Sequence, residues 1–249
     1  MPIALAAVGG LLVGSFLNVV IARLPRGESL ATPGSRCPHC GHAVRPYDNV
    51  PVLSWLVLRG RCRDCGAPIS ARYPLVEVLT GALCAAVVVA KGADEDALLG
   101  LALVLTLVPV TFIDLDHRLI PNRILLPSAA VALAILALTE AGKLPEHLIA
   151  AAAAGGFFLL AVLAYPSGMG MGDVKLAAVM GLYLGVSVAP ALLAALLSGT
   201  LVGAGIIARR GAAEGRKTAV PFGPFLALGA LVGLFAGPEI VDWYRDTFL

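Results

Sequence analysis

The sequence predicts an all-α polytopic membrane protein with about eight transmembrane helices and one large polar loop. Composition is the first reason: 59% of the 249 residues are hydrophobic and 14% are charged, whereas soluble domains are about half apolar and about a quarter charged. The mean hydropathy of +0.89 agrees. The apolar residues also form long runs, and four of the five cysteines fall as two pairs in the one long polar segment.

Eight apolar segments are the candidate helices. The first has the position of a secretory signal, but no basic residue precedes it, no small-residue cleavage site ends it, and Arg23 and Arg26 follow it. We therefore interpret it as a retained span. Several segments are shorter than the roughly 17–25 residues of a straight span, and the sixth and seventh are divided only at Ala189-Pro190. The segments are residues 3–21, 75–90, 98–113, 124–138, 148–165, 176–188, 189–208 and 222–236.

Basic residues orient these helices. The loop 22–73 contains eight arginines, and the other loops on its side hold seven more basic residues, which makes 15 of the 18 lysines and arginines. By the positive-inside rule this side faces the cytoplasm, and both termini lie on the opposite side. Because topology explains the asymmetry, the net charge of +2 does not indicate a nucleic-acid partner. The expected partners are membrane lipid and a substrate, and the sequence makes no prediction of oligomeric state.

The large loop contains two Cys-x-x-Cys pairs separated by 21 residues. This spacing is typical of a tetrahedral four-thiolate zinc site, and a glycine after each pair suits the tight turn of a zinc knuckle. A disulfide does not fit the reducing cytosol. A redox function is an alternative, but two paired motifs favour a metal. His39 and His42 could substitute as ligands, but four thiolates already fill the tetrahedron. Cys84 is interpreted as a buried small hydrophobe. The predicted ligands are Cys37, Cys40, Cys62 and Cys65.

Two acidic residues stand where apolar segments meet the predicted cytoplasmic face. Asp114 follows the third segment, and Asp173 lies 59 residues later, before the sixth. An ionisable group at a membrane boundary is a functional-site hypothesis by default, and two such acids suggest a carboxylate dyad. Asp116 would point about 200° away from Asp114 on a continuing helix, so only one of them can face the partner. The residues leave open which one does.

Asp173 belongs to the motif Gly168-Met-Gly-Met-Gly-Asp-Val-Lys175. Its glycines, including Gly170 and Gly172, permit close approach of backbone or substrate; the alternative is a flexible loop between helices. For Lys175 we favour anchoring at lipid headgroups over tuning of the acids.

These features, in this order, resemble the type IV prepilin peptidases. The resemblance rests on the cysteine tetrad, the 114–121 segment, the Gly-x-Gly-Asp motif and three further stretches. These stretches are Gly14-Ser-Phe-Leu-Asn-Val-Val-Ile-Ala-Arg-Leu-Pro25, Asp48-Asn-Val-Pro-Val-Leu-Ser-Trp-Leu56 with Arg59-Gly-Arg-Cys62, and Ile69-Ser-Ala-Arg-Tyr-Pro-Leu-Val-Glu-Val-Leu-Thr-Gly81. It covers about residues 10 to 180. The archaeal preflagellin relatives lack the cysteine loop, so its presence places the chain with the bacterial bifunctional type.

The resemblance implies an intramembrane aspartic endopeptidase of the inner membrane, with its active site facing the cytoplasm. Such enzymes cut the leader from type IV prepilins or pseudopilins, and then commonly methylate the new amino terminus from S-adenosylmethionine. The family's catalytic aspartates align with Asp114 and Asp173, and Asp116 matches a less decisive family acid. The family locates methylation near the first cytoplasmic loop. Glu77 is our candidate there for binding the amine or the cofactor; the alternative is an interfacial acid paired with Arg72.

Three parts are expected: a first transmembrane helix (1–22), a cytoplasmic zinc-binding loop (23–73) and a multi-helix aspartyl peptidase core (74–249). The main alternative is a peptidase without methyl transfer, in which the zinc loop is structural. A proton-coupled transporter would more often show repeated halves and paired broken helices, and we find no internal repeat. A zinc-bearing assembly factor would leave the two acids unexplained.

Overall fold

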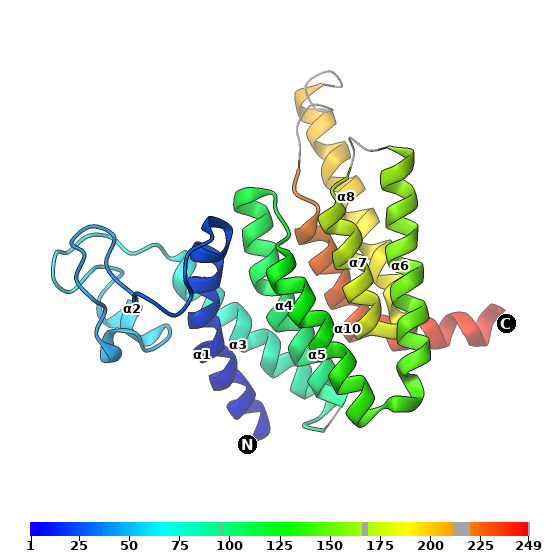
Figure 1. Cartoon of the computed structure of the whole chain (residues 1–249), viewed down its shortest axis with the longest axis horizontal. Helices are drawn as coiled ribbons and strands as arrows, with labels where there is room; N and C mark the ends of the chain where they lie inside the picture. Colours follow the sequence, from blue (N-terminus) through cyan, green and yellow to red (C-terminus); the bar gives the residue numbers. More distant parts are fainter. Residues whose placement is uncertain (95, 166–168, 212–219, 249) are drawn as a thin grey trace. The chain divides into compact units, whose positions relative to one another are not determined.

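The computed structural model describes residues 1–94, 96–165, 169–211 and 220–248. In these ranges the regular structure is helical, and the only β pairing consists of two isolated bridges. The chain divides into two compact units, Met1–Ala97 and Leu98–Leu249, whose helices are shown in Figure 1. This confirms the predicted all-α class.

The first unit is a helix pair that carries the large polar loop. Helix α1 (Pro2–Arg23) packs against α3 (Arg72–Lys91), and the loop between them contains the short helix α2 (Leu53–Val57). The pair is close because glycines lie at the crossing: a Cβ at Gly10 would lie 2.8 Å from the Cα of Gly81, and one at Gly14 would lie 2.9 Å from the Cα of Glu77. Small residues four apart are typical of such close membrane-helix contacts.

The second unit is a helical bundle around α7 (Met171–Leu184), which is buried along most of its length and packs against α5, α6 and α10. Helix α8 packs against α10. A buried hydroxyl cluster joins three of the helices: Thr106 and Ser128 share a 2.7 Å hydrogen bond, and the Tyr183 hydroxyl donates to the Ser128 carbonyl at 2.7 Å. The surrounding helices are α4 (Asp96–His117), α5 (Asn122–Thr139), α6 (Leu144–Ala164), α8 (Val188–Arg210) and α10 (Gly223–Phe248).

Seven helical stretches within the described residues are long and apolar enough to cross a membrane, and one of these, Met171–Arg210, contains both α7 and α8. Counted separately, α7 and α8 give the eight predicted segments. The predicted division at Ala189-Pro190 is wrong, because α7 ends at Leu184 and a 3₁₀ turn, Gly185–Ser187, follows. Gly185 adopts a φ of +53°, which ends the helix, whereas Pro190 lies in the first turn of α8, where proline is tolerated.

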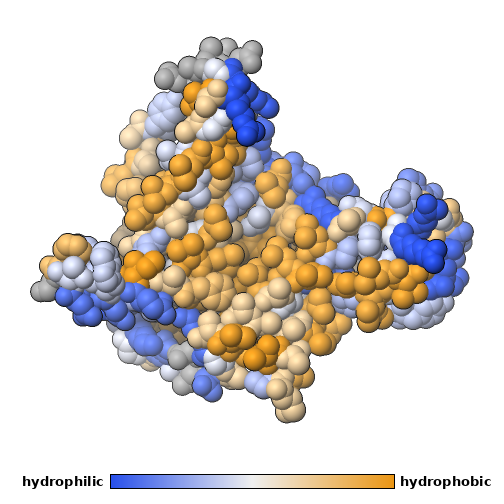
Figure 2. Space-filling view, turned by 180° about the vertical axis from the view of Figure 1, so that it is seen from behind, coloured by the Kyte–Doolittle hydropathy of each residue, from blue (hydrophilic) through white to orange (hydrophobic). Residues whose placement is uncertain are grey.

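The outward helix surfaces are apolar, as lipid contact requires. Figure 2 shows broad hydrophobic surfaces over the helices, with the hydrophilic residues gathered elsewhere. Large exposed side chains on these surfaces include Leu138 and Leu201. In a water-soluble protein such surfaces would be an aggregation hazard, and here they indicate a multi-pass membrane protein.

Candidate functional site

Of the two acids in the Asp-Leu-Asp sequence, Asp114 is the one that faces inward. It lies in the last turn of α4 and is 5% exposed, whereas Asp116 lies on the exposed side of the same turn. The two side chains diverge because residues two apart on a helix point in different directions. The structure therefore decides a question that the residues alone left open.

Asp114 is held by the start of α10. The backbone N–H of Gly223, the first residue of that helix, donates to Asp114 Oδ2 at 2.8 Å. A Cβ at Gly223 would lie 2.7 Å from the same oxygen, so a side chain there would displace the carboxyl group. Helix N-termini favour a negative charge. Sequence reasoning missed Gly223; its signal was a glycine between two prolines, in Pro221-Phe-Gly-Pro224, at the start of an apolar helix.

Asp173 lies in the first turn of α7 and is 9% exposed. The backbone N–H of Gly170 donates to Asp173 Oδ2 at 3.1 Å. A Cβ at Gly172 would lie 2.9 Å from the Cβ of Ile120, so this glycine lets α7 begin directly against the segment that connects α4 to α5. Gly168, the first residue of the motif, lies outside the described residues.

The two aspartates lie at the same end of the second unit. Asp173 and Asp114 interact electrostatically, and both carboxyl groups accept a backbone N–H at or near a helix N-terminus. Lys175 Nζ donates to Asn122 Oδ1 at 3.0 Å, which ties the start of α7 to the start of α5. Two buried carboxyl groups in such a place can hold a shared proton and activate a water molecule.

The four paired cysteines form a second candidate site, in the first unit. All four Sγ atoms lie within 4.8 Å of one another, and the Cys37 and Cys65 sulfurs are 3.8 Å apart. A tetrahedral Zn²⁺ with Zn–S bonds of 2.3 Å would separate its sulfurs by about 3.8 Å. The donor set therefore fits a metal ion.

The two cysteine turns are copies of one structure. Residues 35–44 and 60–69 correspond at a spacing of 25 residues. In both, the N–H of the first cysteine donates to the carbonyl five residues later, at 2.9 and 2.8 Å. Both also have a glycine with φ near +70°, Gly41 and Gly66, after the second cysteine. Residues other than glycine rarely adopt this φ. This short repeat lies within the cysteine loop and is distinct from the repeated halves that a transporter would show.

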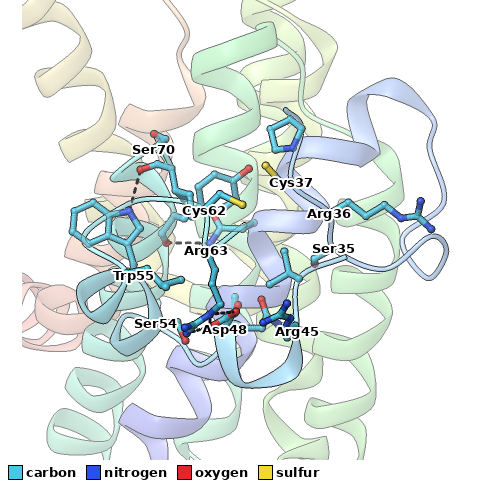
Figure 3. A pocket seen from close by; sticks show the side chains of 18 of the residues that line it. Ser35, Arg36, Cys37, Arg45, Asp48, Ser54, Trp55, Cys62, Arg63 and Ser70 are labelled. Atoms are coloured by element: carbon cyan, nitrogen blue, oxygen red, sulfur yellow. Dashed lines mark hydrogen bonds and ion pairs between the residues drawn. The ribbon is translucent and has the colours of Figure 1, made fainter. Parts of the chain in front are cut away.

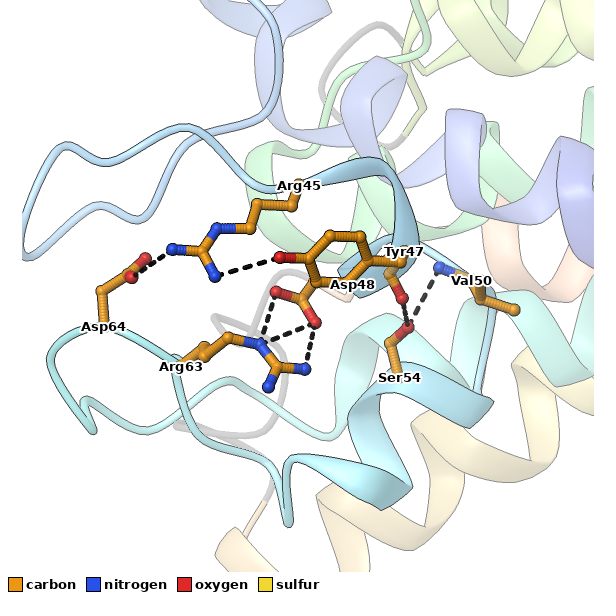
Figure 4. A network of polar contacts seen from close by, with 7 residues as sticks. All are labelled: Arg45, Tyr47, Asp48, Val50, Ser54, Arg63 and Asp64. Carbon is orange, nitrogen blue, oxygen red and sulfur yellow. Dashed lines mark hydrogen bonds and ion pairs between the residues drawn. The ribbon is translucent and has the colours of Figure 1, made fainter.

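Ion pairs fasten the cysteine turns to the rest of the loop (Figure 4). Arg63 donates to both oxygens of Asp48 at distances of 2.6 to 3.0 Å. These hydrogen bonds hold the pKa of Asp48 below its usual value. Arg45 donates to Asp64 at 3.2 Å and to the Tyr47 hydroxyl at 3.0 Å. Bidentate arginine–carboxylate pairs fix geometry as well as charge, so the network holds the second cysteine turn against residues 45–48.

A cavity of about 530 Å³ lies between the cysteine turns, α1 and α3. Figure 3 shows its wall, including Cys37, Cys62, Asp48, Arg63 and Trp55. The Trp55 indole N–H donates to the Ile69 carbonyl at 3.1 Å. The volume falls in the range of small-molecule and cofactor sites, about 300–1,000 Å³.

Glu77 lies in the wall of this cavity and is 8% exposed. Its Oε2 accepts the N–H of Val52 at 2.8 Å, a contact that neither interpretation of Glu77 anticipated. Val52 has φ 61° and ψ −51°, and the Leu53 N–H donates to the Pro51 carbonyl at 2.6 Å. This is a γ-turn of the rare, strained kind. Strain of this kind persists where surrounding contacts impose it, and the buried carboxylate supplies one such contact.

Comparison with known proteins gives two family matches, one in each unit. Residues 8–91 match the bacterial peptidase A24 N-terminal domain, and residues 101–207 match the type IV leader peptidase family. The chain is 40% identical to the prepilin leader peptidase/N-methyltransferase of Aeromonas hydrophila, over 96% of this chain and 92% of that protein. It is 37% identical to the protein of the same name from Burkholderia pseudomallei (strain 1026b), over 95% and 86% respectively.

A third relative of that name, from Myxococcus xanthus (strain DK1622), is 44% identical over 70% of this chain and 54% of its own length. No solved structure matches the chain. The matches span both units, and the alignment with the Aeromonas hydrophila protein runs almost end to end. The chain belongs to the type IV leader peptidase family and carries that family's bacterial N-terminal domain.

Proposed function

We propose that this chain removes the leader peptide from a type IV prepilin or pseudopilin and then methylates the new amino terminus. The observation that carries the proposal is the buried pair Asp114 and Asp173, each held by a backbone N–H, in the unit that matches the leader peptidase family. The relatives' names support the second activity.

In the peptidase reaction the two carboxyl groups share one proton. The ionised aspartate takes a proton from water as the water oxygen attacks the scissile carbonyl, and the protonated aspartate donates a hydrogen bond to that carbonyl oxygen. Collapse of the tetrahedral intermediate breaks the C–N bond, and a carboxyl proton passes to the leaving amine. The apparent pKa values of such a reaction belong to the pair rather than to either residue.

Substitution of either acid tests this assignment. Asp114→Asn and Asp173→Asn should each abolish prepilin cleavage in membranes, because an amide cannot accept the proton of water. Methylation of a peptide that already begins with the mature amino terminus should continue in both variants, because we assign methyl transfer to the cavity of about 530 Å³ in the first unit. Cleavage by either variant at a near wild-type rate would contradict the assignment.

The four cysteines would hold Zn²⁺ in a closed structural site. A closed four-thiolate site leaves no position open for substrate, so the metal's contribution is to fold the loop. It would fix the two cysteine turns against each other and so shape the wall of the adjacent cavity.

We place methyl transfer in that cavity. S-adenosylmethionine, when bound there, supplies the methyl group. The chain's own residues bind and orient: the arginine–carboxylate network keeps the wall rigid, and Glu77 offers a buried carboxylate to a cationic group of the cofactor or to the substrate amine. The contact with Val52 adds a third interpretation of Glu77 to the two given earlier: its side chain supports the wall of the cavity.

The proposed location is the inner membrane, with the loop and both aspartates on the cytoplasmic side. The excess of basic residues in the loops of that side supports this orientation. The proposed functional parts are the first helix (1–22), the zinc-binding loop (23–73) and the peptidase core (74–249). A leader peptide, which is made in the cytoplasm, would then reach the aspartates from the side on which it is synthesised.

A further inference from the structure

Helix α2 has an apolar face that the described residues of its own unit leave exposed. Leu53, Leu56 and Val57 are 61%, 57% and 76% exposed. Their spacing of three and four residues places them on one side of the helix. Val50, just before the helix, is also exposed. Trp55, in contrast, is turned toward the loop and bonded to Ile69, so the exposed face consists of aliphatic side chains alone.

Helix α2 does not lie beyond the cytoplasmic ends of α1 and α3; it begins beside these two helices. The Val52 N–H contacts Glu77, which is the sixth residue of α3 and lies roughly 7 Å along the axis from Arg72. Glu77 in turn lies beside Gly14, nine residues before the end of α1 and so roughly 13 Å from it. Helix α2 therefore begins beside the apolar part of the pair.

A second cavity independently shows that the loop lies beside α1 well before the end of that helix. It has a volume of about 300 Å³ and lies between α1 and the loop, with Leu12, Phe16, Leu30 and Pro51 in its wall. Leu12 is eleven residues before Arg23, roughly 16 Å along α1. The loop thus lies alongside a part of α1 whose side chains, including Leu12 and Phe16, are exposed and apolar.

We propose that α2 rests in the cytoplasmic leaflet of the membrane, with Leu53, Leu56 and Val57 directed to the acyl chains. The partner is the lipid bilayer itself, because α2 begins beside the part of α1 whose exposed side chains are apolar. Arg59 and Arg61, exposed just after the helix, complement anionic headgroups. An apolar face with adjoining arginines is the pattern of an interfacial helix, whose apolar side sinks about 5–10 Å into the headgroup and acyl boundary.

The consequence, which rests on the proposed methyl transfer, concerns the substrate. The γ-turn at Val52 connects the membrane-embedded helix to Glu77 and so to the cavity wall. The cavity would then open at the membrane surface. A cleaved pilin whose apolar amino-terminal segment remains in the bilayer could present its new amine there without leaving the lipid.

Fluorescence quenching tests the position of α2 directly. The chain has two tryptophans, Trp55 and Trp243. In a Trp55→Phe, Trp243→Phe background, Leu56→Trp places a single indole on the apolar face. In vesicles of phosphatidylcholine and phosphatidylglycerol brominated near the headgroup end of the acyl chains, we expect loss of about half its emission, given the depth of an interfacial helix. Iodide in the buffer should have little effect.

The matched control is His39→Trp in the same background, at an exposed position in the polar turn between two cysteines. There iodide should quench and brominated lipid should not. If the indole at position 56 is quenched by iodide and not by brominated lipid, the proposal is wrong. It is equally wrong if that indole is shielded from iodide only when prepilin is added, since the face would then be a substrate-docking site.

Zinc content is measured first for every variant, because loss of Trp55 removes its hydrogen bond to Ile69. If the zinc content falls, Trp55 is kept, and Leu56→Trp in a Trp243→Phe background is compared with Trp243→Phe alone. The emission added by the indole at position 56 should be quenched by brominated lipid and not by iodide, and the reverse would overturn the proposal. No substrate or methyl donor is needed for these measurements, so their failure is distinct from a failure of the proposed function.

Discussion

Gly223→Ala is the substitution that most sharply tests how the peptidase site is built. The added methyl group would lie 2.7 Å from Asp114 Oδ2 and 3.1 Å from its Cγ. Ordinary contact begins near 3.4 Å, so the carboxyl group must shift by about 0.7 Å (3.4 − 2.7). The shift also strains the 2.8 Å hydrogen bond from the Gly223 N–H. Because a misplacement of about 1 Å can cost about a hundredfold in rate, we expect cleavage to fall by about ten- to a hundredfold.

The assay is the rate of leader removal from purified prepilin, with the enzyme in lipid nanodiscs. Gly156→Ala is the control, because a Cβ at Gly156 meets nothing within 4 Å, and its rate should equal that of the wild type. Methylation of a peptide that already has the mature amino terminus should be unaffected in both variants, which separates a displaced aspartate from a misfolded protein. A Gly223→Ala enzyme that cleaves within twofold of the wild-type rate would refute the role given to this contact.

Three further substitutions have distinct expected outcomes. Asp116→Asn should reduce cleavage less than tenfold, since Asp116 lies on the exposed side of α4; complete loss in the same assay would contradict the assignment of Asp114 alone to the pair. Cys62→Ser should lose zinc, measured by metal analysis, and should lose methylation more than cleavage, because structural zinc contributes about 10–16 kcal/mol of apparent binding free energy. Cys84→Ala is the control. An unchanged zinc content in Cys62→Ser would exclude the four-thiolate site. Glu77→Gln keeps an acceptor for the Val52 N–H but removes the charge, so this variant should lose methylation if Glu77 binds a cation. Full methylation in Glu77→Gln, with loss only in Glu77→Ala, would show that Glu77 supports the cavity wall.

The sequence predicted the elements of the fold better than their contacts. Apolar runs and basic residues were enough for the helices, because lipid contact imposes composition on long segments. The predicted position of the break between α7 and α8 was wrong. It was placed at Pro190, but this proline lies in the first turn of α8, and the glycine that ends α7, Gly185, lies a few residues earlier. Periodicity alone could not choose between Asp114 and Asp116, because burial depends on the helices that pack around α4.

The supporting contacts were beyond the reach of sequence patterns. Gly223 approaches Asp114 across 109 positions of sequence, and no local pattern encodes a pairing at that separation. Likewise, the contact between Glu77 and Val52 depends on how the loop folds back along α3. The cysteine spacing, in contrast, was informative because metal ligands must converge on one point whatever lies between them.

The central claim is that one chain performs both cleavage and methylation, with the aspartate pair serving the first reaction only. Intact-mass spectrometry of a prepilin co-expressed with this protein tests it most directly. With the wild type we predict a product that lacks its leader and carries one added methyl group on the new amino terminus. With Asp173→Asn we predict an uncut, unmethylated prepilin. With the wild type, an uncut prepilin or a cut one without the added methyl group would contradict the account, as would a cut prepilin with Asp173→Asn.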